Sequence, residues 1–345
     1  MPLLYLRPAL VLVVLLLGLV ACSAGPDTER LQGRVFGTGW SLVYQVDEGV
    51  PAREVIEEGI LEAFETVNQS MNTYDPESAI SRFNALPADQ PMEMDWDFTY
   101  VFNEARHLSE LTGGAYDVTV SPLVELWGFG PSGPADRPSA ERIAMVLEAV
   151  GLDQLLWQPE TRTLVKRDSH VALELSSIAK GYGVDLAADA LDELGVRNYM
   201  LEVGGELQLR GLSPRGDSWR IAVERPEFGQ SGIQAAVQVT DAGVATSGDY
   251  RNFYEHEGQR YSHLIDPRTG YPITHDLVSV TVIHPSTALA DAWATALCVL
   301  GSDAALALAE QQKLAVYLVR REGDALTASW SSYFGPYLAS GDASG

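Results

Sequence analysis

Apolar residues recur at helical spacing in four stretches of the chain, and elsewhere they alternate with polar residues as in strands. The helical stretches are residues 53–69, 98–111, 140–150 and 302–312. The strand-like stretches are residues 35–46, 198–211, 219–224, 233–240 and 314–320, and 198–211 predicts either two strands or one bulged strand. Because strands and helices do not alternate regularly, the pattern predicts an α+β fold rather than a doubly wound sheet. We expect mixed sheets and helices in two subdomains around one shared cleft.

The two ends of the chain lack these patterns. Residues 1–21 carry a single charged side chain, Arg7, before an apolar run that is too short for a comfortable transmembrane helix and is typical of a secretory signal. Cys22 follows this run as in the lipobox of bacterial lipoproteins, so we expect residues 1–21 to be a lipoprotein signal peptide and Cys22 to be acylated. An ordinary signal peptide with an incidental cysteine is the alternative. We further expect a tether at 22–34, one domain at 35–338 and a disordered tail at 339–345.

The composition suits a large buried core and a solvated acidic surface. Of the 345 residues 46% are hydrophobic, and 47 acidic against 23 basic side chains give a net charge of −24. Nucleic-acid binding needs a basic footprint, so the charge argues against a nucleic-acid partner. Cys298 lies in an apolar helix and is expected to be inert core; with Cys22 acylated, no internal disulfide is expected.

The apolar segment STALADAWATALCVLG places one carboxylate, Asp291, in an apolar helix, and Thr295 follows on the same face one turn later. A buried carboxylate is costly unless a positive group meets it, and a hard cation such as Mg²⁺ prefers oxygen ligands. The alternative is that Ser286 or Thr287 caps the helix, so that Asp291 lies near the first turn, while Thr295 bonds back to the carbonyl of Ala292 or Asp291. Spacing alone favours this alternative.

Histidines gather in the same region, at His256, His263, His275 and His284. No two of them are two, three or four residues apart and no cysteine accompanies them, so a zinc site is not expected. His263 stands in SHLIDPRTGYPI, which predicts a strand followed by a turn at Pro267 and Gly270. A lone strand histidine is more often structural than catalytic.

Two further segments predict binding sites. In GGAYDVTVSPLVELWGFGP a glycine pair precedes Ala115, Tyr116 and Asp117, which suits either a flavin or ribose pocket or a buried turn that closes a helix. In ELSSIAKGYGVDLAADALDELG a strand and a small-residue turn lead into a helix, whose free amides beside Lys180 would suit a diphosphate. The spacing of glycine and lysine is not that of a Walker loop.

These segments, together with MNTYDPESAISRFN, TSGDYRNF and DAWATAL, occur in an order that resembles the ApbE family, the FAD:protein FMN transferases. The resemblance implies Mg²⁺ bound by Asp291, Thr295 and a backbone carbonyl, here that of Ala179. It implies His263 as the catalytic base. The positions that the resemblance assigns to the flavin nucleotide are Phe36, Tyr74, Ala115, Tyr116, Asp117, Lys180 and Ile265. Many relatives carry Met at the position of Phe36 and an acidic residue at that of Lys180.

The implied activity is Mg²⁺-dependent transfer of FMN from FAD to a threonine or serine hydroxyl of a target protein, with release of AMP. Hydrolysis of FAD to FMN and AMP by the same site is the first alternative, and a non-catalytic FAD-binding lipoprotein is the second. A structural surface lipoprotein would leave Asp291 and His263 unexplained. The resemblance and the lipobox together imply a lipid-anchored protein of the bacterial cell envelope that faces the periplasm. Its targets would be exported domains of membrane redox complexes, such as the sodium-pumping NADH:quinone reductase.

Overall fold

The computed structural model describes residues 26–133, 137–226, 232–248, 253–256, 259–323 and 325–339, leaving aside the side chains of 254–260. Its centre is an eight-stranded sheet in which every neighbouring pair is antiparallel. The strand order is β1 (Thr28–Val35), β2 (Thr38–Gln45), β6 (Tyr199–Val203), β7 (Glu206–Arg210), β10 (Ala242–Gly248), β15 (Leu277–His284), β16 (Ala315–Glu322) and β17 (Ala325–Trp330). The stretch 198–211 is therefore two strands joined by a glycine turn.

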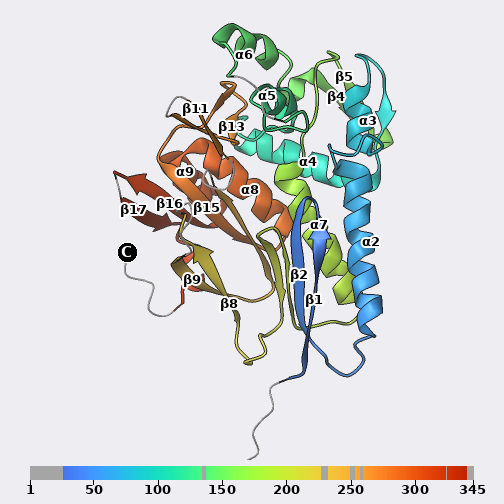
Figure 1. Cartoon of the computed structure of the whole chain (residues 1–345), viewed down its shortest axis with the longest axis vertical. Helices are drawn as coiled ribbons and strands as arrows, with labels where there is room; N and C mark the ends of the chain where they lie inside the picture. The colour runs from blue at the N-terminus through green and yellow to red at the C-terminus, as the bar shows by residue number, and fades with distance from the viewer. Residues whose placement is uncertain are drawn as a thin grey trace, which may run out of the picture.

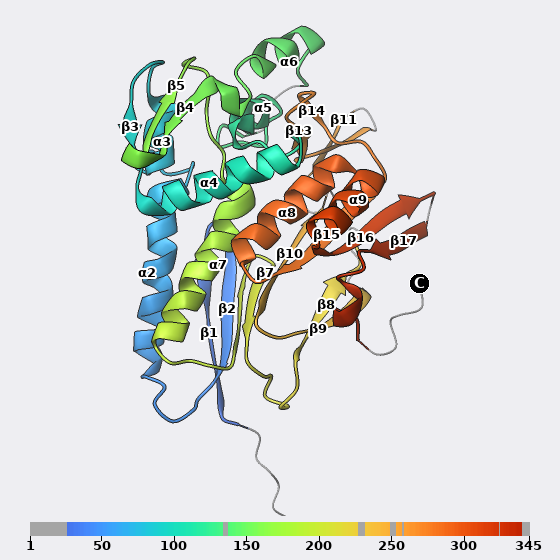
Figure 2. The same cartoon turned by 180° about the vertical axis from the view of Figure 1, so that it is seen from behind.

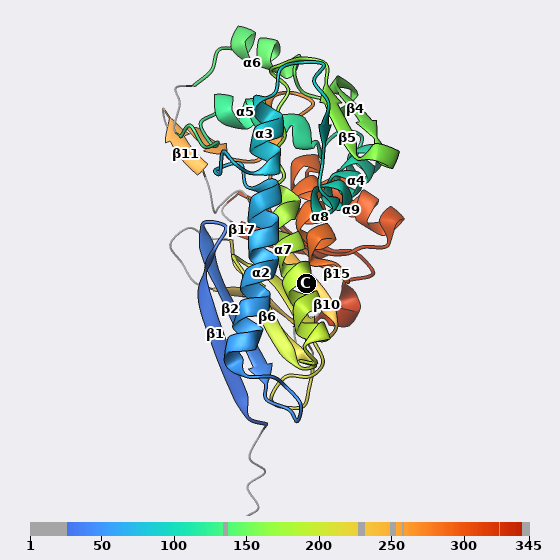
Figure 3. The same cartoon turned by 90° about the vertical axis from the view of Figure 1, so that its right-hand side faces the viewer.

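Long helices cover one face of this sheet (Figures 1 and 2). They are α2 (Arg53–Met71), α7 (Ser176–Glu193), α8 (Thr287–Leu300), α4 (Trp96–Leu111) and α9 (Ser302–Gln312). Figure 3 shows α2 running beside α7, and α7 in turn packs against α8. Apolar side chains from α2 and α7, among them Ile56, Phe64 and Leu191, pack on Leu42 and Tyr199 of the sheet. A second core fills the space between α4, α7, α8 and β15.

Shorter elements form a cap over one end of this helix layer, at the top of Figure 1. Its helices are α3 (Ala79–Ala85), α5 (Ser121–Leu126) and α6 (Ala140–Leu147), with the 3₁₀ turns η1 (Val118–Val120), η2 (Leu152–Gln154) and η3 (Pro159–Thr161). Its strands are β3 (Met92–Glu93), β5 (Thr163–Lys166) and β4 (Leu155–Gln158), and the pairs β11 (Phe253–His256) with β12 (Gln259–Ser262) and β13 (Ile265–Asp266) with β14 (Tyr271–Pro272). The pair β8 (Trp219–Glu224) with β9 (Ile233–Val239), and η4 (Gly335–Tyr337), lie beside the main sheet.

The predicted α+β class is confirmed by this mixture of antiparallel sheets and separate helices. The four helices predicted from apolar spacing are present as α2, α4, α6 and α9, with ends that shift by a few residues. Within the described residues, no helix combines the length and apolar character needed to cross a membrane.

The predicted tether at 22–34 is wrong from Thr28 onward, because these residues form β1 and pair along their whole length with β2. Leu31 is the one fully buried side chain of the strand, and most of its neighbours are exposed, so the segment lacks the alternation of a half-buried strand. The predicted signal peptide, Cys22 and residues 340–345 lie outside the described residues. Ala339, the first residue of the predicted tail, donates a backbone hydrogen bond to the carbonyl of Ala236 at 2.9 Å.

The turn between β1 and β2 contains only Phe36 and Gly37, which both have positive φ angles, 50° and 74°. Two-residue turns of this kind match the twist of the flanking strands. The turn presses the Phe36 ring onto α7: a β-carbon on Gly183 would stand 2.8 Å from that ring. The start of the stretch 35–46, which was predicted as strand, is therefore a hairpin turn, and β2 begins after it at Thr38.

Candidate active site

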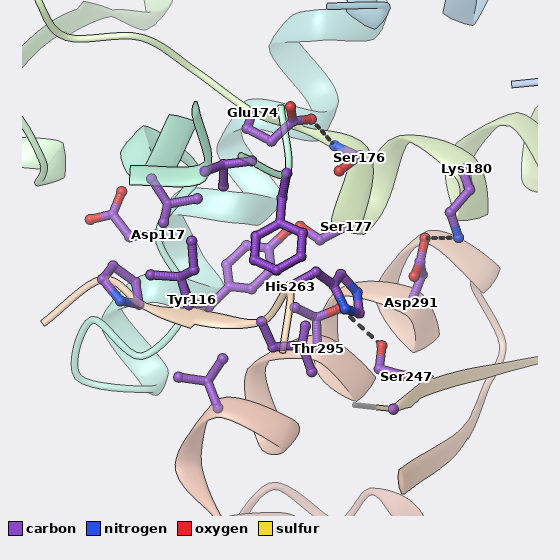
Figure 4. A pocket seen from close by; sticks show the side chains of 18 of the residues that line it. Tyr116, Asp117, Glu174, Ser176, Ser177, Lys180, Ser247, His263, Asp291 and Thr295 are labelled. Carbon is purple, nitrogen blue, oxygen red and sulfur yellow. Dashed lines mark hydrogen bonds and ion pairs between the residues drawn. The ribbon is translucent and has the colours of Figure 1, made fainter. Parts of the chain in front are cut away.

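A cavity of about 410 Å³ lies between the helix layer and the cap (Figure 4). Residues from α7, α8, β7 and β10 form one side of it, and residues from η1, the β12–β13 connection and β13 form the other. Of the predicted site residues, the cavity is lined by Tyr74, Ala115, Tyr116, Asp117, Lys180, His263, Ile265, Asp291 and Thr295. The fold thus gathers nine of the eleven positions predicted for catalysis, nucleotide and metal, and these come from segments far apart in the sequence.

Asp291 projects into this cavity from the second turn of α8. Ser286 caps the helix, as the alternative interpretation allowed, since its Oγ accepts a hydrogen bond from the Leu289 amide. The Asp185 carboxylate of α7 accepts hydrogen bonds from two more backbone amides, those of Thr287 at 2.7 Å and Ala288 at 3.0 Å. Asp291 is the fifth residue of the helix and so lies close to the first turn, as the alternative expected, but Ser286 and Asp185 satisfy the amides of that turn.

The Asp291 carboxylate is only 3% exposed, and few groups of the protein stabilise its negative charge. It accepts one hydrogen bond, from the Gly181 amide at 3.2 Å, and the Lys180 ammonium is 3.9 Å from its Oδ2. Burial raises the pKa of Asp291 to about 8; Lys180 opposes this rise and the nearby Glu206 adds to it. A cation entering the cavity would restore the charged form of this carboxylate.

Thr295 lies one turn after Asp291, and its hydroxyl pairs with the hydroxyl of Ser247 on β10 at 3.0 Å. The Thr295 hydroxyl thus contacts the sheet instead of bonding back to a carbonyl of its own helix, as the alternative proposed. Asp291, Thr295 and Ser247 thus offer carboxylate and hydroxyl oxygens side by side in one cavity. The described residues contain no cluster of three or more His, Cys, Asp or Glu side chains that could hold a metal. A donor set of mixed oxygens suits a hard cation rather than zinc.

Lys180 forms an ion pair that the sequence did not predict. Its Nζ is 2.8 Å from Oε1 of Glu206, the first residue of β7, and this carboxylate is 2% exposed. The other oxygen of Glu206 has no hydrogen-bond partner among the described residues. The sequence does contain one feature that could have indicated a buried polar position here. An acidic residue follows Gly204-Gly205 directly, and Gln208 stands at the next buried position of the same strand face.

The helix α7 begins earlier than predicted. Ser176 is its first residue, and the Ser176 amide is held by Oε1 of Glu174 at 2.8 Å. Lys180 and Gly181 therefore lie within the second turn instead of preceding the helix. Ser176 and Ser177 still line the cavity, so the amino-terminal end of α7 does face it.

The segment around Tyr116 serves the fold and the cavity together. The Tyr116 hydroxyl accepts a hydrogen bond from Ser177 Oγ at 3.0 Å, which joins the cap to α7. Asp117 accepts bonds from the amide and the hydroxyl of Thr119 at 2.8 and 2.6 Å, and burial raises its pKa. A buried turn closes α4, as one interpretation expected, and its residues also line the cavity. The flavin or ribose pocket stays a prediction.

A second hollow of about 610 Å³ adjoins the first and shares four residues with it, Tyr74, Glu174, Ser176 and Lys180. The two remaining predicted residues, Phe36 and Ala179, line this second hollow only. Tyr74 stands at the border, and 71% of its surface is exposed although it is aromatic. The two hollows therefore adjoin each other, and the aromatic ring of Tyr74 lines both of them.

His263 lies in the connection between β12 and β13, where the sequence predicted a strand followed by a turn. Its ring packs edge-on against Phe129, with the ring centroids 6.3 Å apart. Asp266 does not reach the cavity: it binds Arg268 through two hydrogen bonds of 2.9 and 2.8 Å and closes the turn. This turn follows the connection from which His263 faces the cavity in Figure 4.

The family model for ApbE matches residues 36–318 of the chain. This protein belongs to the ApbE family. It is 41% identical over 331 residues to the FAD:protein FMN transferase of Haemophilus influenzae, covering 94% of this chain and 96% of that protein. The Vibrio cholerae protein of the same name is 40% identical over 335 residues, covering 97% of this chain and 100% of that one.

Solved structures of ApbE proteins agree with this assignment. The flavin transferase ApbE from Vibrio cholerae superimposes with a TM-score of 0.85 at 39% identity, covering 91% of this chain and 100% of that one. The apo form of the Pseudomonas stutzeri flavinyl transferase ApbE gives 0.82 at 38% identity, covering 90% of this chain and 96% of that one. The ApbE family that the sequence motifs indicated is therefore confirmed.

Proposed function

We propose that this ApbE protein is a Mg²⁺-dependent transferase that moves FMN from FAD to a threonine or serine hydroxyl of a target protein and releases AMP. The observation that carries the proposal is the buried Asp291 carboxylate, which faces a cavity with further oxygen donors and is 3.9 Å from the Lys180 ammonium. The names of the relatives support the choice of substrates, and the residues shared by the two hollows support a diphosphate site between them.

The residues present fit a hard cation. The Asp291 carboxylate and the Thr295 hydroxyl, which line the same cavity, would hold Mg²⁺. Ala179, whose carbonyl the family resemblance adds to this set, lines only the neighbouring hollow. When bound, the ion would neutralise charge on the diphosphate of FAD. The Lys180 ammonium and the amino-terminal end of α7 at Ser176 add positive potential on the same side.

His263 is the proposed general base. The attacking hydroxyl must lose its proton as it approaches the phosphorus atom next to riboflavin, and a neutral imidazole at the cavity wall can accept that proton. The exposed ring of Tyr74, at the junction of the two hollows, would stack on one planar end of the dinucleotide. Ala115, Tyr116 and Ile265 would enclose the part of the nucleotide that lies in the first hollow.

The direct test mixes the purified protein with FAD, Mg²⁺ and a threonine-bearing acceptor protein. Covalent flavin fluorescence on the denatured acceptor, with AMP released in equal amount, supports transfer. AMP without labelled acceptor supports hydrolysis of FAD, and tight FAD binding without AMP supports a storage protein. The Asp291→Ala variant is expected to lose nearly all AMP release while it keeps the fold. Full activity of this variant would remove the metal assignment.

The location follows as a separate proposal from the apolar run that ends at Cys22. Acylation of Cys22 would anchor the enzyme to the bacterial envelope, where exported domains of membrane redox complexes, of the sodium-pumping NADH:quinone reductase type, would serve as acceptors. The test is the Cys22→Ser variant expressed as the full chain. It should move from the membrane fraction to the soluble fraction, and retention in the membrane fraction would contradict acylation.

A further inference from the structure

Three charged side chains, Lys180, Glu206 and Asp291, lie next to one another in the lining of the cavity. Only Lys180 and Asp291 have a role in the proposed function. Lys180 stands between two buried carboxylates, with its Nζ 2.8 Å from Glu206 and 3.9 Å from Asp291. Both carboxylates are almost completely buried, at 2% and 3% exposure, whereas about a third of the Lys180 side chain is exposed. These two carboxylates therefore compete for the ammonium, and the closer of them is not a proposed metal ligand.

The position of Glu206 is fixed by the backbone. It is the first residue of β7, directly after a turn in which Gly204 and Gly205 both have positive φ angles, 61° and 107°. Val203 and Glu206 pair across this turn, and the buried Glu206 side chain meets Lys180 of α7. Two residues later on β7, the side chain of Gln208 is held by the Thr287 hydroxyl, which donates a hydrogen bond to its Oε1 at 2.6 Å.

We propose that Glu206 is a positioning residue that holds the Lys180 ammonium away from Asp291, so that the Asp291 carboxylate stays available to a divalent cation. The proposal rests on the proposed function, because it takes Asp291 as the metal ligand. Without the charge of Glu206, the flexible Lys180 side chain would pair with Asp291, the remaining buried carboxylate. The Lys180 ammonium would then stand where the metal binds. A divalent cation could bind to Asp291 only after displacing this ammonium.

A different role for Glu206 makes the opposite prediction. Its second oxygen lacks a hydrogen-bond partner among the described residues, and a metal ligand would also leave an oxygen unpaired in a metal-free protein. If Glu206 bound the metal directly, removal of its charge would weaken binding whether or not Lys180 is present. If it only holds Lys180, the loss should disappear once the ammonium is also removed.

The experiment measures Mn²⁺ binding to the full chain by the electron paramagnetic resonance signal of the free ion, without FAD or acceptor. Glu206→Gln is expected to weaken Mn²⁺ binding by about tenfold or more, the range typical of residues that orient metal ligands. Lys180→Met should bind Mn²⁺ at least as tightly as the parent protein. The double variant Glu206→Gln/Lys180→Met should return to within about threefold of the parent protein.

Two controls make the outcome decisive. Glu202→Gln removes one charge from the same hairpin, at a side chain that holds the Gly205 amide at 2.8 Å, and should leave Mn²⁺ binding unchanged. Asp291→Asn should abolish binding, and a parent protein that binds no Mn²⁺ would overturn the metal assignment itself. If the parent protein binds Mn²⁺ but the double variant binds it as weakly as Glu206→Gln does, the positioning role of Glu206 alone would be overturned. Circular dichroism and thermal unfolding establish that each variant is folded.

Discussion

Gly181 of α7 and Thr287 of α8 lie so close that a β-carbon on the glycine would stand 2.4 Å from the Thr287 carbonyl oxygen. The same crossing brings the Gly181 amide to Asp291 and places Lys180 beside the cavity. A glycine inside a helix costs stability, and here close approach of two backbones explains it. The contact between the two helices therefore determines where the proposed metal ligand stands.

Replacement of Gly181 by alanine is expected to force the two helices apart. We expect a loss of about 1–3 kcal/mol in the free energy of unfolding, measured by urea denaturation, because the obstructing atoms belong to backbone and cannot turn away. Mn²⁺ binding should weaken as well, since Asp291 would lose its amide partner. The control is Gly59→Ala in α2, where the nearest atom is a flexible Leu194 methyl at 3.4 Å. Equal effects of the two variants would contradict this account.

Replacement of His263 by asparagine separates its chemical role from a structural one. Loss of a general base typically lowers the rate by about 10²–10⁴-fold, and we expect a fall of that size in labelling of the acceptor. Mn²⁺ affinity should stay unchanged, because Asp291 and Thr295 lie on α8 and His263 lies on the cap. Stopped assays at saturating FAD measure the rate. A parallel loss of metal binding and thermal stability would indicate that the histidine only supports the fold.

Lys166 is a completely buried lysine that sequence reasoning did not single out. Its ammonium donates to three backbone carbonyls, those of Asn84 at 2.7 Å, Ser169 at 3.1 Å and Val171 at 3.0 Å, and burial lowers its pKa. Lys166→Met should therefore destabilise the protein by about 1–3 kcal/mol, the cost of leaving buried acceptors unpaired. Urea denaturation measures the change. The same substitution at the exposed Lys313 should be close to neutral, and a neutral result at Lys166 would contradict the assigned role.

Local patterns predicted much of this fold, and the failures have physical causes. The cap residue Ser286 and the buried face of α8 follow from short-range spacing, which the sequence displays directly. In contrast, β1 contains one fully buried side chain, so its strand character depends on its pairing with β2. Glu206 was missed because its partner Lys180 is on another element, and the acidic residue after Gly204-Gly205 does not by itself identify that partner.

His284, at the end of β15, should make stability depend on pH. Its Nδ1 accepts the Ser286 amide at 3.0 Å, beside the cap of α8, and burial lowers its pKa from the ordinary 6.5. The unfolded chain therefore binds the proton more readily than the folded chain. The contribution of this group is fully present above about pH 6.5 and is lost as the pH falls below that value, by at most about 1.4 kcal/mol per pH unit.

The measurement is the free energy of unfolding in urea at several pH values from 7.5 down to about 5. His284→Asn keeps an acceptor for the Ser286 amide but cannot be protonated, so its stability should fall less steeply than that of the parent protein below about pH 6.5. His107→Asn, at an exposed histidine of α4, should leave the parent slope unchanged. Identical slopes for the parent protein and His284→Asn would show that the loss in acid arises from other groups.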